Sequence, residues 1–214
     1  MNQQTYFITG TDTHIGKTYV TTHLLNQFNQ QGLSTVGLKP IASGATCTEE
    51  GLVNEDAHLL QKTASTHVPL TDINPFVFAP AIAPHLAAKQ NGITLNCDMI
   101  SQRVTQTINH YQPDRCLIEG AGGIAVPIND QEIIADLIKL LNVPVILVVG
   151  IRLGCINHAI LSSELIDRYK IRYAGWIANC IEPECEEKDE IIATLQKKIS
   201  AQLIKIVDFN EKPD

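Results

Sequence analysis

Short apolar runs alternate along the chain with segments in which apolar residues recur every three or four positions. The apolar runs have the pattern of buried parallel strands, which are covered by helices on both faces. They lie at residues 6–10, 35–38, 115–118, 143–149 and 174–178. The helical pattern occurs at Val20, Leu24 and Phe28, ending near Gly32, and again at residues 100–111, 156–166 and 191–199. This alternation predicts an α/β fold, a mostly parallel sheet with helices on both faces.

One segment departs from the alternation. Four prolines interrupt residues 69–92, so we expect a loop excursion over the sheet there. No repeat, low-complexity tract or linker divides the chain, and 214 residues are enough for one core of ordinary size. We therefore expect a single domain over residues 1–214, with ligands bound at the carboxyl ends of the strands.

The charge of the chain argues against polyanionic partners. Sixteen Lys and Arg against 23 Asp and Glu give a net charge of -7, and an acidic protein repels nucleic acid and anionic lipid. The longest apolar run, residues 143–150, is far shorter than a membrane span. The first residues lack the features of a signal peptide. We expect no nucleic-acid or membrane partner and a cytoplasmic location.

The cysteines agree with that compartment. The chain has six cysteines and no Cys-x-x-Cys pair. Disulfide frameworks belong to short secreted chains, so we expect buried, reduced thiols. The residues concerned are Cys47, Cys97, Cys116, Cys155, Cys180 and Cys185.

Residues 10–18, Gly-Thr-Asp-Thr-His-Ile-Gly-Lys-Thr, follow the first predicted strand and open the first predicted helix. Exposed N–H groups at a helix start and a nearby Lys are what a phosphate-binding loop requires. Thr18 would offer its hydroxyl to Mg²⁺. The strict pattern G-x-x-x-x-G-K-[ST] is not met, because Thr11 stands at its first glycine. We still favour a nucleotide site in a P-loop NTPase-like fold over an ordinary turn, since Lys17 and Lys39 are the only basic residues among the first sixty.

Three further charged residues could belong to this site. Lys39 follows the second predicted strand. It could point at the γ-phosphate or at an anionic substrate, or it could be an ordinary solvated side chain, and the spacing does not distinguish these interpretations. Glu119 follows the strand at residues 115–118, where P-loop enzymes place a carboxylate for Mg²⁺. Asp56 is a possible second ligand, although the sequence favours an acid placed at a helix start by the helix dipole.

Other candidates carry weaker signals. The segment Gly120-Ala121-Gly122-Gly123 is either a loop whose amides approach a substrate or a tight turn. Gly154, Cys155, Ile156 and Asn157 start a helix after the most apolar strand, which suits binding of a carboxylate. A Cys155–His158 nucleophile pair is disfavoured. Asn179 ends a strand and could contact a nucleotide base through its amide.

Five motifs together resemble the dethiobiotin synthetase family. They are Gly-Thr-Asp-Thr-x-x-Gly-Lys-Thr at 10–18, Lys-Pro-x-Ala-Ser-Gly at 39–44, Glu-Gly-Ala-Gly-Gly at 119–123, Gly-x-x-Leu-Gly-Cys-Ile-Asn-His-Ala at 150–159 and Gly-Trp-x-Ala-Asn at 175–179. The resemblance implies a homodimeric enzyme of the biotin pathway with its substrate site at the interface. It would use ATP, Mg²⁺, CO₂ and 7,8-diaminopelargonic acid. A substrate amine captures CO₂ as a carbamate, the carbamate attacks the γ-phosphate, and the second amine closes a ureido ring and expels phosphate.

The resemblance also implies roles for individual residues. Lys17 and Lys39 would neutralise the transferring phosphoryl group, and Thr13 and Ser43 would position the carbamate and the diamine. Thr18, Asp56 and Glu119 would hold Mg²⁺. The residues 154–157 would reach across the dimer to the substrate carboxylate. The nucleotide would be bound by Asp12, Thr13, His14, Ile15, Gly16, Lys17, Thr18, Glu119, Gly120, Ala121, Gly122, Gly123 and, at the adenine, Asn179.

Two departures and two alternatives remain. His14 stands where family members often carry an acid, and residues 203–209 lack the Pro-Trp-Leu type segment that helps to hold the base. We therefore expect weak selection among ATP, CTP and GTP. A partitioning-type ATPase switch is the first alternative, but the second Lys of its loop is missing. A cobyrinate-type amidating synthetase is the other, but the chain leaves no room for a glutaminase domain.

Overall fold

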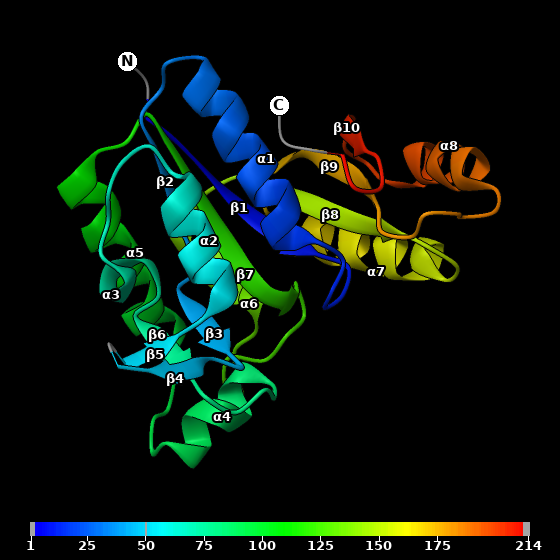
Figure 1. The fold of residues 1–214 in the computed structure, drawn as a ribbon. Helices are drawn as coiled ribbons and strands as arrows, with labels where there is room; N and C mark the ends of the chain where they lie inside the picture. Colours follow the sequence, from blue (N-terminus) through cyan, green and yellow to red (C-terminus); the bar gives the residue numbers. More distant parts are fainter. Residues whose placement is uncertain (1–2, 50, 212–214) are drawn as a thin grey trace.

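The computed structural model describes residues 3–49 and 51–211 and is drawn in Figure 1. Strands and helices alternate over much of the chain. In order they are β1 (Gln4–Gly10), α1 (Lys17–Gln30), β2 (Thr35–Leu38), β3 (Ile41–Ser43), β4 (Thr46–Thr48), β5 (Gly51–Val53), α2 (Glu55–Thr63), α3 (Leu70–Ile73), β6 (Phe76–Phe78), α4 (Pro84–Gln90), α5 (Cys97–Tyr111), β7 (Arg115–Gly123), α6 (Ile134–Leu141), β8 (Val145–Ile151), α7 (Cys155–Arg168), β9 (Tyr173–Cys180), α8 (Lys188–Lys198) and β10 (Leu203–Val207).

Six strands of the described chain form one parallel sheet in the order β10-β9-β8-β1-β7-β2. β1 lies inside the sheet, with β7 on one side and β8 on the other. From β1 the chain runs through α1 to β2, on one side of β1, and after β7 it crosses to β8, on the other side. The direction of the strand order therefore reverses beside β1. In open α/β sheets, ligands bind at such a point. The fold therefore places the Gly-Lys-Thr loop at the expected ligand site.

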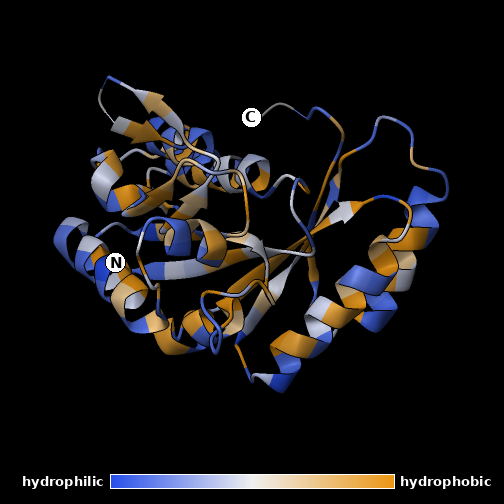
Figure 2. Cartoon of the chain, turned by 90° about the horizontal axis from the view of Figure 1, so that it is seen from below, coloured by the Kyte–Doolittle hydropathy of each residue, from blue (hydrophilic) through white to orange (hydrophobic). Residues whose placement is uncertain are grey.

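Helices cover both faces of this sheet, which confirms the predicted fold class. Successive strand side chains point to opposite faces, so Ile8 packs with α1 whereas Phe7 belongs to the larger core on the other face. That larger core includes residues of α5, α6, α7 and α8. Figure 1 shows α1 and α7 on opposite sides of the sheet, and in Figure 2 its inner strands are mostly in hydrophobic colours.

The expected loop excursion at residues 69–92 is wrong in part, because α3, β6 and α4 lie within it. Two of its prolines stand at helix starts, Pro69 as the N-cap of α3 and Pro84 as the first residue of α4. Proline is compatible with that position, since its missing N–H would have no partner inside the helix. β6 pairs in parallel with β3 beside the main sheet.

The interpretation of residues 120–123 as a loop or a turn is also wrong, because β7 continues through them to Gly123. Glycine is required where β7 approaches β1. A Cβ on Gly120 would lie 2.9 Å from the ring of Phe7, and one on Gly123 would lie 3.2 Å from the carbonyl oxygen of Gly10. The pairing of the two strands shifts in register between Ile8 and Gly10.

All six cysteines are free thiols, but two of them are not buried as expected. Cys47 is exposed because it lies in the β4–β5 hairpin outside the main sheet, and Cys185 is half-buried before α8. None of the helices in the two described segments combines the length and the apolar character that a bilayer crossing needs.

Candidate functional site

The loop between β1 and α1 presents a helix start without a side-chain cap. Gly16 is the N-cap of α1, with φ at 80°, and no side chain bonds the first N–H groups. Those groups can therefore bind an anion. Gly16 is also sterically required, because an added Cβ would lie 2.2 Å from Nδ2 of Asn179. That nitrogen donates to the carbonyl oxygen of Ile15 at 2.8 Å, so β9 supports the loop directly.

Ile15 fixes the loop to the sheet. Its side chain is buried between the ends of β1 and β8, where a Cβ on Gly10 or on Gly150 would lie 2.8 Å from it. The loop turns at His14, which has a positive φ of 58°. The apolar side chain of Ile15 therefore anchors the loop, while its polar neighbours face the cavity.

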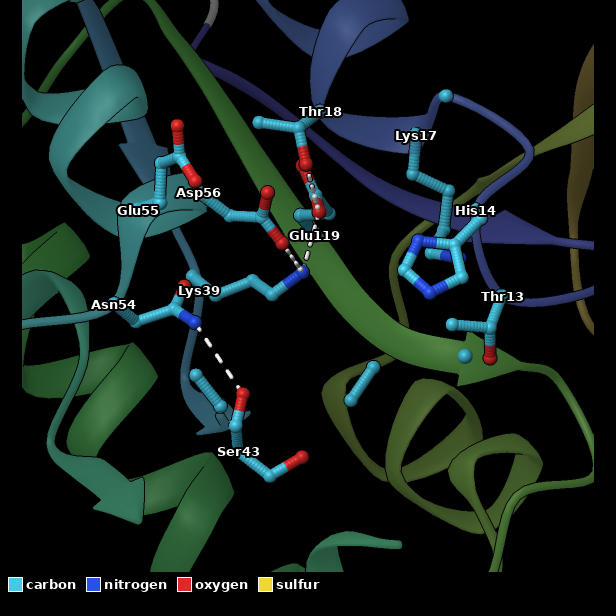
Figure 3. A pocket seen from close by; sticks show the side chains of 14 residues that line it. Thr13, His14, Lys17, Thr18, Lys39, Ser43, Asn54, Glu55, Asp56 and Glu119 are labelled. Atoms are coloured by element: carbon cyan, nitrogen blue, oxygen red, sulfur yellow. Dashed lines mark hydrogen bonds and ion pairs between the residues drawn. The ribbon is translucent and has the colours of Figure 1, made fainter. Parts of the chain in front are cut away.

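The side chains of four predicted residues meet at one point, as Figure 3 shows. The ammonium group of Lys39 lies 2.9 Å from Oδ2 of Asp56 and 2.5 Å from Oε1 of Glu119. The hydroxyl of Thr18 donates to the same Glu119 oxygen at 2.8 Å. Lys39 is buried, so the solvated alternative for this residue is wrong. Asp56 is the second residue of α2 and bonds Lys39, so it is more than a helix-start acid.

Electrostatics keep this cluster charged. Burial opposes the charged form of Lys39, but the adjacent Glu119 and Asp56 carboxylates outweigh it and raise the pKa of Lys39. Burial would likewise raise the pKa of Asp56, yet Lys39 lowers it on balance. Both groups are therefore ionised at neutral pH, and the ammonium group offsets the two carboxylates.

The oxygen atoms of the cluster suit a magnesium ion. Oε2 of Glu119 is buried and has no hydrogen-bond partner within the described chain. A buried carboxylate oxygen normally has a partner, and Mg²⁺ prefers one or two carboxylates together with phosphate and water oxygens. No cluster of three or more His, Cys, Asp or Glu side chains with metal-binding geometry occurs among the described residues. A magnesium ion at this point would be coordinated by Glu119, Asp56 and the hydroxyl of Thr18.

Lys17 lies on the other side of the same cavity. Its ammonium group donates to the carbonyl oxygen of Asp12 at 2.8 Å. Burial, and after it the positive charge of Lys39, lowers the pKa of Lys17 to about 8. Within the described segments, the ammonium group of Lys17 contacts a carbonyl oxygen and not a carboxylate, so its charge remains available for a triphosphate.

This pKa gives a prediction for nucleotide binding. Only protonated Lys17 attracts phosphate, so the affinity for ATP should fall as the pH rises through about 8. Arginine stays protonated over this range. We expect the fall to disappear in Lys17→Arg, even if that variant binds more weakly. Calorimetric titration between pH 7 and 9.5 measures both profiles; an identical fall in the variant would contradict the assignment to Lys17.

Most of the predicted site residues line one cavity of about 520 Å³. A second cavity of about 370 Å³ lies beside it, and Thr13 lines both. Apolar side chains such as Ile124, Leu161 and Leu165 contribute to the second cavity. The predicted residues that line the first cavity are Thr13, His14, Gly16, Lys17, Thr18, Lys39, Ser43, Asp56, Glu119, Ala121 and Gly122.

The other predicted residues lie elsewhere. Ile15 and Asn179 are buried beneath the loop, and Gly120 packs on Phe7. Asp12 and Gly123 line the second cavity. The residues 154–157 line neither cavity; Gly154 is the N-cap of α7, Cys155 is buried, Ile156 is half-buried and Asn157 is exposed.

Sequence reasoning missed some residues of the site. Ala42, Asn54 and Glu55 line the first cavity. The side chain of Asn54 caps α2 by accepting from the N–H of Ala57 at 3.2 Å, and its Nδ2 lies 3.4 Å from the carbonyl oxygen of Ser43. An Asn directly before two acids is a helix-start signal, so the position of Asn54 beside Asp56 could have been inferred.

A phosphate loop after the first strand of a parallel sheet, with Lys-Thr at the helix start and a carboxylate on the adjacent strand, defines the P-loop NTPase class. The model of the AAA domain family matches residues 4–212. Solved structures agree on the fold. A ParA family ATPase from Chlorobium tepidum has a TM-score of 0.58 at 13% identity, covering 98% of this chain and 86% of that one. Chloroplast FtsY from Physcomitrella patens has a TM-score of 0.55 at 13% identity, and the match covers 96% of this chain and 58% of the FtsY chain.

Curated relatives identify the family within that class. An ATP-dependent dethiobiotin synthetase of Pseudomonas aeruginosa (strain UCBPP-PA14) is 45% identical over 92% of this chain and 86% of its own length. The dethiobiotin synthetase of Chromohalobacter salexigens is 46% identical over 95% of this chain and 89% of its own length. That of Legionella pneumophila (strain Philadelphia 1) is 41% identical over 97% of this chain and 94% of its own length. The chain belongs to the dethiobiotin synthetase family. The relatives support neither the partitioning switch nor the cobyrinate-type synthetase.

Proposed function

We propose that the chain is the synthase that converts 7,8-diaminopelargonic acid, CO₂ and ATP into dethiobiotin, ADP and phosphate. The observation that carries the proposal is the meeting of Lys17, Lys39, Thr18, Asp56 and Glu119 in one cavity at the phosphate loop. Membership of the dethiobiotin synthetase family supplies the substrates. The cavity of about 520 Å³ has room for the triphosphate and the reacting end of the diamine.

The reaction proceeds in three steps. One amine of the substrate adds to CO₂ and loses a proton, giving a carbamate. A carbamate oxygen attacks the γ-phosphorus, ADP leaves, and a carbamic-phosphoric anhydride forms. The second amine then attacks the carbonyl carbon and loses a proton, the C–O bond to phosphate breaks, and phosphate departs as the ureido ring closes. Because every nucleophile belongs to the substrate, the protein has to supply positioning and charge neutralisation.

The two lysines supply the charge. Lys17 binds the outer phosphates of ATP, and Lys39 faces the carbamate and the phosphoryl group as they approach each other. Both side chains are buried, at 7% and 5% exposure, so water screens their charges weakly. Thr13 and Ser43 line the same cavity and orient the carbamate and the diamine. The hydrocarbon chain of the diamine extends past Thr13 into the apolar second cavity.

Thr18, Asp56 and Glu119 hold Mg²⁺. When bound, the ion neutralises charge on the β- and γ-phosphates. The unpartnered Oε2 of Glu119 supports this assignment. Asp56 comes from α2 and Glu119 from β7, and their carboxylates lie next to each other at the Lys39 ammonium group (Figure 3).

A homodimer completes the substrate site. Residues 154–157 lie outside the cavity of their own chain, so in the dimer the amino end of α7 reaches the substrate carboxylate of the partner. Two leucines support a protein contact there. Leu153, in the turn before α7, is 96% exposed, and Leu161, in the middle of α7, is 61% exposed; large apolar side chains with such exposure favour an interface.

We assign the nucleotide base to the region beside Asn179, which is buried and donates its amide nitrogen to the carbonyl oxygen of Ile15, and we expect weak selection among bases. The segment after β10 is tied to α1, since His23 Nε2 lies 3.0 Å from the carbonyl oxygen of Glu211. It is also tied back to β10, because Lys205 pairs with the side chain of Glu211 at 2.7 Å. Its one aromatic residue, Phe209, is 42% exposed. We predict turnover of ATP, CTP and GTP at limiting concentration within about tenfold of one another, because the amide nitrogen of Asn179 is already bonded to the loop and only its oxygen is left to contact a base. A strong preference for ATP would contradict this.

We assign the enzyme to the cytoplasm. The six thiols are free, and four of them are buried in the core. Reduced cysteines are stable in that compartment.

Phosphate release tests the proposed function. With ATP, Mg²⁺ and bicarbonate, release should require 7,8-diaminopelargonic acid, and dethiobiotin should appear in equal amount by mass spectrometry. The monoamine analogue that lacks one amino group serves as a control, because it cannot close the ring. Phosphate release at an unchanged rate without the diamine would refute the synthase assignment.

A further inference from the structure

An ion pair joins the phosphate loop to the loop before α7. Nη2 of Arg152 lies 2.8 Å from Oδ2 of Asp12, although the two residues are 140 positions apart in the sequence. Their side chains are 38% and 41% exposed. Asp12 lines the second cavity but not the first, where the phosphates are proposed to bind. The contact therefore needs an explanation other than direct binding of phosphate.

Asp12 holds two residues of the proposed active site. Its Oδ1 accepts from the N–H of Thr13 at 2.7 Å, and its carbonyl oxygen accepts from the ammonium group of Lys17 at 2.8 Å. Both Thr13 and Lys17 line the first cavity. A change in the position of Asp12 would thus move the residues that bind phosphate and carbamate.

Arg152 is tied in the same way to the start of α7. It follows β8 directly, and its carbonyl oxygen accepts from the N–H of Cys155 at 3.1 Å. That bond closes the turn around Gly154, the N-cap of α7, whose φ is 87°. The side chain of Arg152 contacts the phosphate loop while its backbone shapes the helix end to which we assign the substrate carboxylate.

We propose that Arg152 is a positioning residue that couples nucleotide binding to diamine binding. The inference rests on the proposed function and adds a residue to which that function assigns no role. ATP fixes Lys17 and, through Asp12, the guanidinium of Arg152. The turn before α7 is then held in the geometry that binds the carboxylate of the diamine in the partner's site, so the coupling runs across the dimer. Coupling between two ligands is reciprocal, so the diamine should strengthen nucleotide binding by the same factor.

The size of the coupling follows from the exposure of the pair. Ion pairs of this exposure contribute modestly, equivalent to about a two- to fivefold change in an equilibrium constant. Calorimetric titration of the diamine, with and without a non-hydrolysable ATP analogue and Mg²⁺, should show the analogue tightening diamine binding by about that factor. In Arg152→Gln the factor should fall to one, while each ligand alone still binds.

Matched variants separate coupling from a general loss of structure. Arg152→Lys keeps the charge and should retain part of the factor. Asp12→Asn should abolish it, and Asp12→Asn with Arg152→Gln should cause no further loss of coupling. Arg103→Gln is the control, since this arginine also pairs with an aspartate at 3.9 Å and is similarly exposed, at 47%, but lies on α5. Circular dichroism and molar mass verify folding and assembly for each variant.

The outcomes distinguish the two proposals. The coupling role would be overturned if the ATP analogue did not change diamine affinity in the unmodified enzyme, or if it tightened diamine binding equally in Arg152→Gln. Either result would leave the synthase assignment standing. An enzyme that neither binds the diamine nor needs it for phosphate release would overturn both.

Discussion

Replacing Lys17 with alanine is expected to lower diamine-dependent phosphate release by at least about a hundredfold, the loss typical of one pre-organised charge at a transition state. Lys17 is buried at the start of α1 and directed into the cavity. Lys17 is 7% exposed, so solvent screens its charge weakly and water replaces that charge poorly. Initial rates at saturating ATP, bicarbonate and diamine measure the effect.

Lys62→Ala is the matched control, because Lys62 is an exposed base in the last turn of α2. We expect its rate to stay within a factor of two, as for most surface substitutions. A Lys17→Ala enzyme that retains most of its activity would remove the phosphate-loop assignment, however well the loop matches in sequence.

Replacing Lys39 with methionine should abolish activity and also destabilise the fold. The ammonium group bonds Glu119, whose side chain is fully buried, and Asp56, whose side chain is 44% exposed. Removing one partner of a buried pair leaves an uncompensated charge and costs about 3 kcal/mol or more. In a chain of this size that corresponds to a Tm about 6 °C lower or more. Differential scanning calorimetry measures the shift.

A double variant separates the two effects. Lys39→Met with Glu119→Gln removes both charges of the pair, and the amide has nearly the shape of the carboxylate. We expect most of the lost stability to return, whereas turnover should remain below about 1% because the catalytic charges are missing. Equal instability of the single and the double variant would show that the pair is not what stabilises this region.

Five of the six strands in the central sheet were predictable because their pattern is strong, whereas the edge strand β10 was not predicted. Val145–Ile151 is buried along its whole length, and a short continuous apolar run of this kind is typical of a central parallel strand. The phosphate loop was predictable from its place between a strand and a helix. Glu119 was expected at the carboxyl end of a strand, but it lies in the middle of β7, with its side chain beside Thr18 and Lys39.

The remaining features depend on contacts that the sequence does not display. Glycine usually ends a strand, yet residues 120–123 continue β7, because their small size lets β1 approach closely. Asp56 has the sequence of an ordinary helix-start acid, and only the packing of α2 beside β2 brings it to Lys39. The Asp12–Arg152 pair joins segments 140 positions apart, which no local pattern could indicate.

The most direct test of the account follows an oxygen atom. With CO₂ labelled in both oxygens by ¹⁸O, and reaction times of seconds so that exchange with water is small, the carbamate carries the label into its bond with phosphorus. Ring closure breaks the C–O bond, so the released phosphate should contain one ¹⁸O and dethiobiotin should retain the other in its ureido carbonyl. Mass spectrometry of both products reads the result. Unlabelled phosphate released with dethiobiotin would contradict phosphorylation of the carbamate, the central claim of the proposed function.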